Sequence, residues 1–180
     1  IRASRRDILR FGAAGAAMAA LPARADADPW RHAAAIANGV QAPRFAARVF
    51  DVTAYGAKGD GTTLDTDAIA RAIAACTEAG GGRVLVPVGV FLTGAVHLKS
   101  NVELHLVAGA TLLFSTDPAH YPMVFTRWEG IELINYSPLV YAFKAKSIAV
   151  TGAGTLDGQG SAEHWWPWKG RTNCGWSRGD

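Results

Sequence analysis

Two short stretches of the sequence combine cationic and aromatic residue types that could bind a ligand. Arg127 offers a guanidinium that matches a carboxylate with two hydrogen bonds, and Trp128 offers an aromatic plane for stacking. The second stretch contains Trp165, Trp166, Trp168 and Lys169. Because aromatic side chains on loops often serve binding, we predict these six residues as substrate-binding. The alternative is that the tryptophans only anchor their loops and that Arg127 pairs with Glu129.

The acidic residues and histidines do not form a recognisable catalytic centre. Glu129 and Glu132 are close in sequence, but they flank a predicted loop-to-strand junction and are interpreted as solvated charges or members of local salt bridges. His97 and His105 fall in predicted strands, where a local hydrogen bond is a simpler role than that of a catalytic base. The sequence has no CxxC motif and no His/Cys cluster. We therefore assign no catalytic residue, no metal site and no cofactor.

The first residues are typical of an export signal. Arg5 and Arg6 are followed by an Ala/Gly-rich apolar stretch, residues 11–21, and then by the small-residue cleavage motif of residues 25–27. The paired arginines indicate the twin-arginine route, and the apolar stretch is shorter than the ~20 residues that span a bilayer. We predict residues 1–27 as this signal, and a periplasmic or extracellular protein with no membrane contact beyond export. The alternative is an Ala-rich helix of the folded protein.

The positive charge of the sequence belongs to this first segment. The 180 residues contain 18 Lys+Arg and 15 Asp+Glu, and residues 1–27 hold five of the arginines and two of the aspartates. The remaining sequence is electrically balanced. Basicity therefore gives no reason to expect a nucleic acid partner.

The rest of the chain divides into a lead-in, residues 28–48, and an ordered region, residues 49–180. Within the lead-in, residues 30–36 can form a short helix that Pro43 ends. Because the chain begins at Ile1 and ends in a polar, Gly-rich run, we interpret it as the N-terminal part of a longer protein. We expect that protein to be a monomer.

Residues 65–79 are predicted to form an amphipathic helix. Asp65 or Thr66 can cap it, and the three glycines at 80–82 end it. Its apolar residues recur at helical spacing and form one stripe: Leu64, Ala68, Ile69, Ala72, Ile73 and Cys76. A buried thiol is common on such a face, so we expect no bond between Cys76 and Cys174.

From Arg83 onward, short apolar and β-branched runs alternate with turn residues. The runs are residues 84–86, 90–92, 95–98, 102–106, 111–114, 139–143 and 147–150. Residues 101–104 resemble 147–150, and each stretch is followed by a turn and a Thr-Leu pair. Val84 and Val102 are similarly placed, about 20 residues apart, which is the length of one solenoid coil.

These repeats predict an all-β fold of stacked parallel coils. Between the predicted strands we find no hairpin signal such as Asn-Gly, which a sandwich would need. The helix at 65–79 would cap the exposed end of the solenoid. Residues 115–138 are predicted to be a long loop that forms one wall of a groove. Asp117 and Asp157 are interpreted as turn residues that order their own backbone.

Two parts of the sequence resemble known proteins. Residues 50–61 resemble the opening of many pectin-active right-handed parallel β-helix proteins, which include hydrolases and lyases. The succession of residues 134–141, 154–160 and 165–169 is similar to bacterial members of glycoside hydrolase family 28, the polygalacturonases and their relatives. The resemblance covers about Trp30–Gly170. It implies a right-handed parallel β-helix of the pectin lyase type.

The resemblance also implies inverting hydrolysis of α-1,4-linked galacturonan. The family's catalytic site uses Asn-Thr-Asp, Asp-Asp, Gly-His-Gly and Arg-Ile-Lys motifs, and none of them occurs here. We therefore expect the catalytic half to lie beyond Asp180 and the 180 residues alone to be inactive. One alternative is a polysaccharide lyase, which would need a Ca²⁺-binding acidic cluster and a basic residue. Another is a non-catalytic, carbohydrate-binding β-helix protein.

Overall fold

The computed structural model describes residues 29–166 of the chain. The chain forms two compact units, Ile1–Ala42 and Pro43–Asp180. The described part of the first unit contains α2 (Pro29–Gly39), which confirms the short helix predicted for the lead-in and extends it at both ends. Between residues 29 and 166, no helix is both long and apolar enough to cross a membrane.

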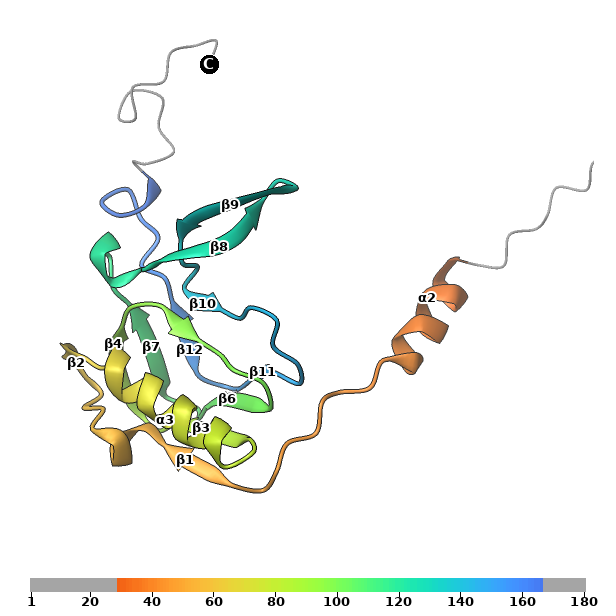
Figure 1. Cartoon of the computed structure of the whole chain (residues 1–180), viewed down its shortest axis with the longest axis horizontal. Helices are drawn as coiled ribbons and strands as arrows, with labels where there is room; N and C mark the ends of the chain where they lie inside the picture. Colours follow the sequence, from red (N-terminus) through yellow and green to blue (C-terminus); the bar gives the residue numbers. More distant parts are fainter. Residues whose placement is uncertain (1–28, 167–180) are drawn as a thin grey trace, which may run out of the picture. The chain divides into compact units, whose positions relative to one another are not determined.

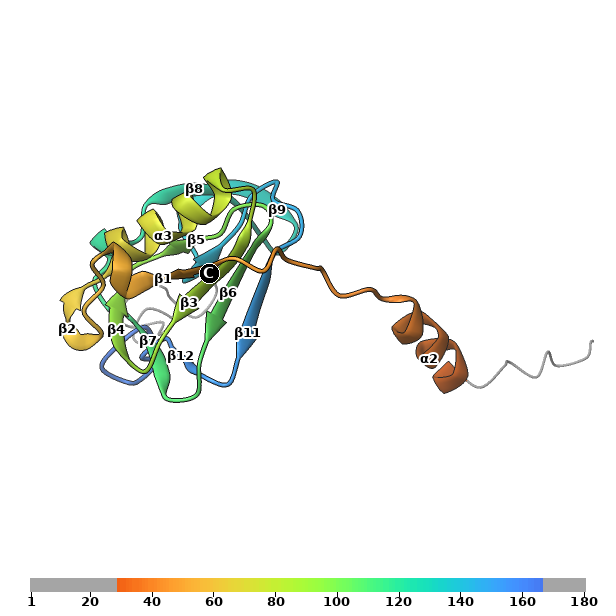
Figure 2. The ribbon, with the colours of Figure 1, turned by 90° about the horizontal axis from the view of Figure 1, so that it is seen from below.

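The second unit consists mostly of short parallel strands (Figures 1 and 2). One sheet has the order β1-β3-β6-β11, another has the order β12-β7-β4-β2, and β5 pairs with β10. The strands of the first sheet are β1 (Val49–Asp51), β3 (Gly82–Val86), β6 (Val102–Leu106) and β11 (Ala149–Gly152). The others are β2 (Asp60–Leu64), β4 (Gly89–Thr93), β7 (Ala110–Phe114), β12 (Thr155–Asp157), β5 (Val96–His97) and β10 (Val140–Tyr141). All these pairings are parallel, as predicted.

Strands that pair within a sheet lie one coil apart in the sequence. Gly82 of β3 pairs with Val102 of β6, and hydrogen-bonded side chains of these two strands are 20 residues apart. The predicted coil length is therefore confirmed. The register differs by two residues from the predicted one, because Val84 pairs with Leu104. Side chains alternate with a period of two, so this shift leaves the same residues facing inward.

The repeat seen between residues 101–104 and 147–150 is also confirmed. β11 pairs with β6, and β12 pairs with β7, so the two stretches stack on each other. Asn101 and Ser147, which precede the paired strands, both adopt the left-handed conformation, with φ of 63° and 52°. The same backbone turn therefore begins both coils.

The helix α3 (Thr66–Glu78) confirms the amphipathic helix predicted at 65–79. It packs on β1, β3, β5 and the 3₁₀ turn η2 (Val52–Tyr55). Its buried stripe joins the core of the unit and comprises Ala68, Ile69, Ala72, Ile73 and Cys76. Figure 2 shows α3 lying over the strands of the first sheet.

The N-cap position predicted for Asp65 is confirmed, but a capping role of its side chain is not. Asp65 stands at the N-cap of α3, but its side chain makes no capping hydrogen bond. Its two carboxylate oxygens instead accept from the backbone N–H groups of Lys58 and Gly59, at 2.8 and 3.0 Å. Gly59 adopts a left-handed φ of 64°, which glycine reaches without a steric cost. Asp65 therefore ties the glycine-rich opening segment to the start of α3.

The segment 115–138 is not one long loop, which corrects a second prediction. After the 3₁₀ turn η3 (Pro118–His120), β8 (Met123–Trp128) and β9 (Ile131–Tyr136) form an antiparallel hairpin. Its two-residue turn is Glu129-Gly130, with φ of 48° and 89°. This turn needs positive φ at both positions, and Glu-Gly supplies it without the expected Asn-Gly signal.

Candidate functional site

Arg127 and Trp128 lie near the free end of this hairpin. The register places Trp128 opposite Ile131 and Arg127 opposite Glu132, whereas Glu129 occupies the turn. The side chain of Trp128 is 67% exposed. Because successive side chains of a strand point to opposite faces, the guanidinium and the indole offer two separate contacts rather than one joint site. Glu132 belongs to β9, where it lies opposite Arg127 in the register, rather than to a loop-to-strand junction.

Trp165 is held in place by hydrogen bonding and aromatic packing. Its indole N–H donates to the carbonyl of Gly158 at 2.7 Å. Its ring meets the ring of Tyr121 edge-on, with centroids 5.9 Å apart and an angle of 81°. Trp165 therefore anchors its loop, as the alternative to direct binding supposed. It does so beside a pocket.

This pocket has a volume of about 250 Å³ and lies where three segments of the chain meet. Pro118 and Tyr121 come from the turn before the hairpin. Tyr136 is the last residue of β9, and the three residues that follow it also line the pocket. Gly158 and Trp165 supply the remaining wall. The predicted groove-wall segment and the predicted tryptophan cluster thus meet here, which the sequence alone did not indicate.

Of the six predicted binding residues, those that the structure describes do not converge on one point. Trp166 is 63% exposed, and Trp168 and Lys169 lie outside the described residues. Trp165 lines the pocket together with Tyr136. This pocket lies at the base of the hairpin, because Tyr136 pairs with Met123 at the end opposite the turn. Arg127 and Trp128 are at the other end. The described residues therefore offer two contact regions, the hairpin end and the pocket.

His97 has the local structural role predicted for it. Its Nε2 lies 2.9 Å from the hydroxyl oxygen of Ser137, and that hydroxyl donates to the carbonyl of Pro138. The only proton of the hydroxyl is thereby used, so Nε2–H of His97 is the donor. Burial lowers the pKa of His97 and favours the neutral ring.

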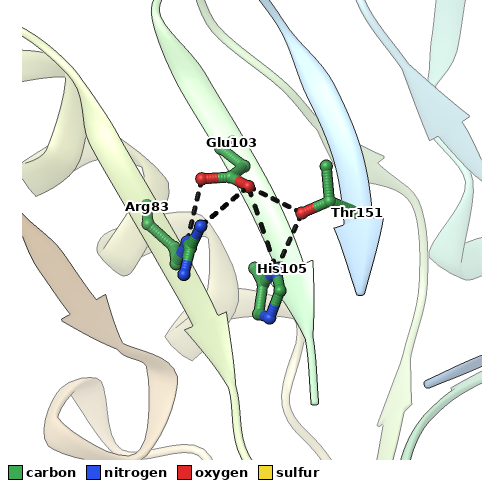
Figure 3. A network of polar contacts seen from close by, with 4 residues as sticks. All are labelled: Arg83, Glu103, His105 and Thr151. Atoms are coloured by element: carbon green, nitrogen blue, oxygen red, sulfur yellow. Dashed lines mark hydrogen bonds and ion pairs between the residues drawn. The ribbon is translucent and has the colours of Figure 1, made fainter. Parts of the chain in front are cut away.

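A polar network on the first sheet connects three successive coils (Figure 3). Arg83 of β3 donates two hydrogen bonds to Glu103 of β6, at 2.8 and 3.1 Å. Thr151 of β11 donates to the same carboxylate at 2.7 Å, and Nδ1 of His105 lies 2.8 Å from the Thr151 hydroxyl oxygen. Because that hydroxyl already donates to Glu103, Nδ1–H of His105 must be the donor.

This network has a structural role. The hydrogen bonds from Arg83, and then that from Thr151, lower the pKa of Glu103 and keep the carboxylate ionised. Its oxygens are occupied by side chains of neighbouring coils. Sequence reasoning missed the network, although the 20-residue period aligns Arg83 with Glu103. Between residues 29 and 166, no three His, Cys, Asp or Glu side chains are grouped to hold a metal ion.

Comparisons with known proteins agree with this architecture. Residues 49–109 match the family described as rhamnogalacturonase A/epimerase, pectate lyase-like. The exopolygalacturonase of Thermotoga maritima superimposes with a TM-score of 0.72 and 51% identity, covering 81% of this chain and 32% of that one. The family 28 exopolygalacturonase of Yersinia enterocolitica superimposes with a TM-score of 0.57 and 35% identity, covering 63% of this chain and 21% of that one. The exo-poly-alpha-D-galacturonosidase of Dickeya chrysanthemi is 43% identical, covering 63% of this chain and 20% of that protein.

The chain is homologous to the exopolygalacturonases of glycoside hydrolase family 28. This confirms the resemblance found in the sequence. The chain spans only about a fifth of the Dickeya protein and a third of the Thermotoga one. A shorter match, 48% identity over 63 residues, is to alginate lyase 7 of Azotobacter vinelandii and covers 31% of this chain and 7% of that protein. The chain is thus similar to a lyase as well as to hydrolases.

Proposed function

We propose that the protein containing this chain is a pectin-degrading glycoside hydrolase that cleaves α-1,4-galacturonan-type linkages. The observation that carries this proposal is the 51% identity with an exopolygalacturonase over 81% of the chain. The names of the relatives favour removal of terminal units over cleavage within the polymer.

Catalysis would follow the inverting mechanism, with catalytic carboxylates outside the 180 residues. Inversion needs an acid and a base roughly 6.5–9.5 Å apart, so that a water molecule fits between the base and the sugar. The absence of all four family motifs and the short span of the chain on its relatives support this location.

The complete fold would be a closed right-handed parallel β-helix, with α3 as its N-terminal cap. The inward row Val84, Leu104 and Val150 supports further coils. The first two side chains are fully buried, but Val150 in β11 is 44% exposed. Another coil stacked on β11 would bury it, as β6 buries β3.

In this protein the hairpin and the pocket at its base would meet the polysaccharide. Arg127 would pair with a galacturonate carboxylate and Trp128 would stack on a sugar ring, each from its own face of the hairpin. Trp165, Trp166, Trp168 and Lys169 would form the second contact region. The protein would act as a monomer, without a nucleic acid partner.

Residues 1–27 would direct twin-arginine export to the periplasm or the medium. The adjacent arginines, the apolar stretch and the small-residue motif occur in the order that such signals require. A reporter fused to residues 1–27 should be exported, and replacement of Arg5 and Arg6 by lysines should retain it in the cytoplasm. Export that is unaffected by this replacement would exclude the twin-arginine route.

The catalytic proposal is tested with polygalacturonate and two protein forms. The complete protein should release reducing ends without forming an unsaturated uronide, and the first product should be a small terminal unit. The 180 residues alone should release nothing. Turnover by the 180-residue chain would place the catalytic groups within it and contradict the proposal.

A lyase is the second candidate, because the alginate lyase match reaches 48% identity. The same assay separates the two reactions. Elimination leaves a double bond that absorbs ultraviolet light in the product, whereas hydrolysis does not. An absorbing product from the complete protein would therefore favour the lyase.

A further inference from the structure

The pocket at the base of the hairpin differs in chemistry from a site for a charged sugar. Among residues 29–166, none of the side chains that line it carries a charge, and its walls are formed mainly by Pro118, Tyr121, Tyr136, Pro138, Leu139 and Trp165. A galacturonate carboxylate placed here would lose its hydration without gaining a cationic partner among these lining residues, which is unfavourable.

The polar atoms of three lining residues are already bonded within the protein. The Tyr121 hydroxyl donates to the carbonyl of Ser115, and the Trp165 indole donates to Gly158. The Ser137 hydroxyl donates to Pro138 and accepts from His97. These residues consequently present ring and carbon surfaces to the pocket rather than donors or acceptors.

The pocket is open and close to the proposed substrate contacts. Tyr136 is half exposed at its rim, and Trp165 belongs to the predicted tryptophan cluster. A volume of about 250 Å³ admits a small uncharged substituent together with the edge of the sugar ring that carries it. The substituent would be only partly enclosed. A neutral, weakly polar group attached to a polysaccharide matches both the charge and the size of the site.

We propose that this pocket is a subsite for a methyl-esterified galacturonate unit, with the ester methyl group against Tyr121 and Trp165. The inference rests on the proposed function, because it names the form of pectin that this region of the protein selects. Esterification removes the charge of the carboxylate, so the desolvation penalty that excludes the free acid is absent. Arg127, at the far end of the hairpin, would select a free carboxylate on another unit.

The test compares two short oligogalacturonides of equal length, one with a methyl ester on a single unit and one with every carboxylate free. Saturation-transfer NMR with the 180-residue chain should show the strongest transfer to the ester methyl protons. Titration should give about tenfold tighter binding of the esterified ligand, as expected when an unpaired charge need not be buried. Equal affinities, or no transfer to the methyl protons, would overturn the proposal. If another segment of the chain already fills the pocket, no transfer to the methyl protons will be seen.

Tyr136→Lys places a cation at the rim of the pocket and should reverse the preference. Val88→Lys is the matched control, because it adds the same charge at a position between β3 and β4, outside both proposed contact regions, where Val88 is 72% exposed. The control should keep the preference for the ester. A preference unchanged by Tyr136→Lys, in a variant with an unaltered circular dichroism spectrum, would place the ester elsewhere and overturn the assignment.

These outcomes are separable from those of the proposed function. Hydrolysis of free polygalacturonate by the complete protein, combined with no preference for the ester, would leave the hydrolase proposal intact and reject the subsite. Ester binding without any hydrolysis would do the reverse.

Discussion

The stacked parallel strands and the β8–β9 hairpin are both β-structure, but they bury their side chains very differently. In the stack, inward residues such as Leu104 and Leu112 are fully buried, and each strand pairs with the next coil. In the hairpin, Trp128, Ile131 and Ile134 are all more than half exposed. The stack therefore has the burial that stabilises a fold, whereas the hairpin has accessible surface that can meet a ligand.

The comparison also separates two uses of polar residues. On the stack, Arg83, Glu103 and Thr151 satisfy one another across three coils. On the hairpin, Arg127 lies opposite Glu132 in the register and is exposed, so its guanidinium can reach solvent or ligand. The same residue type thus holds coils together in one region and is available for recognition in the other.

Leu104→Ala should have the largest effect on stability. It removes a fully buried side chain from the centre of the stack and should lower the free energy of unfolding by ~2–5 kcal/mol. Denaturant titration measures this change. Ile134→Ala, in the hairpin, should cost less than about 0.5 kcal/mol. Similar losses for both variants would remove the distinction between the two regions.

Glu103→Gln should destabilise the stack at neutral pH, because it weakens the hydrogen bonds from Arg83 and Thr151. The pKa of Glu103 is lowered in the folded protein, so its contribution is present above the ordinary carboxyl pKa and is lost as the pH falls through the folded value. Thermal unfolding of both proteins at neutral and acid pH should show the difference shrinking with acidity. A difference that is independent of pH would contradict an ionised Glu103 in the network.

Gly130→Ala should cost about 1–2 kcal/mol within the hairpin, because Gly130 has a φ of 89° that alanine adopts poorly. An added Cβ would meet no atom within 4 Å, so the cost is conformational only. Hydrogen exchange should become faster in β8 and β9 while β3 and β6 stay protected. Faster exchange in the stack would show that the two regions unfold together.

Trp128→Ala should have the smallest effect on stability and a clear effect on binding. We expect unchanged unfolding and about tenfold weaker binding of an unesterified oligogalacturonide by titration calorimetry, because exposed aromatic anchors contribute strongly to recognition. Ile131→Ala, which removes its cross-strand neighbour, is the matched control. Equal losses of affinity in the two variants would contradict a specific role for the indole.

The sequence predicted the stack far better than the hairpin, for a physical reason. Helix α3 buries one stripe of apolar residues, so helical apolar spacing reveals it. The stacked strands recur with a period of about 20 residues, so this period reveals them. The hairpin buries little, and its Glu129-Gly130 turn lacks the usual Asn-Gly residues, so its sequence resembles a loop. β2 was missed as well, because its glycine and threonine residues are typical of turns.

The candidate site shows the same limit. The types of its residues could be chosen from the sequence, since arginine and tryptophan have known preferences. Their placement could not be predicted from the sequence. The contact of Tyr121 with Trp165 brings together two segments that the β8–β9 hairpin separates in the sequence, so it depends on how the hairpin folds. The pocket between them depends on hydrogen bonds that no local pattern predicts.

Mapping of backbone amide shifts by NMR during titration with a short oligogalacturonide tests the central claim most directly. The account predicts that shifts concentrate at Arg127, Trp128 and the residues around the pocket, including Tyr136 and Trp165. Shifts centred on the Arg83–Glu103 network of the stack, with the hairpin unchanged, would contradict the division between a stabilising region and a recognising one.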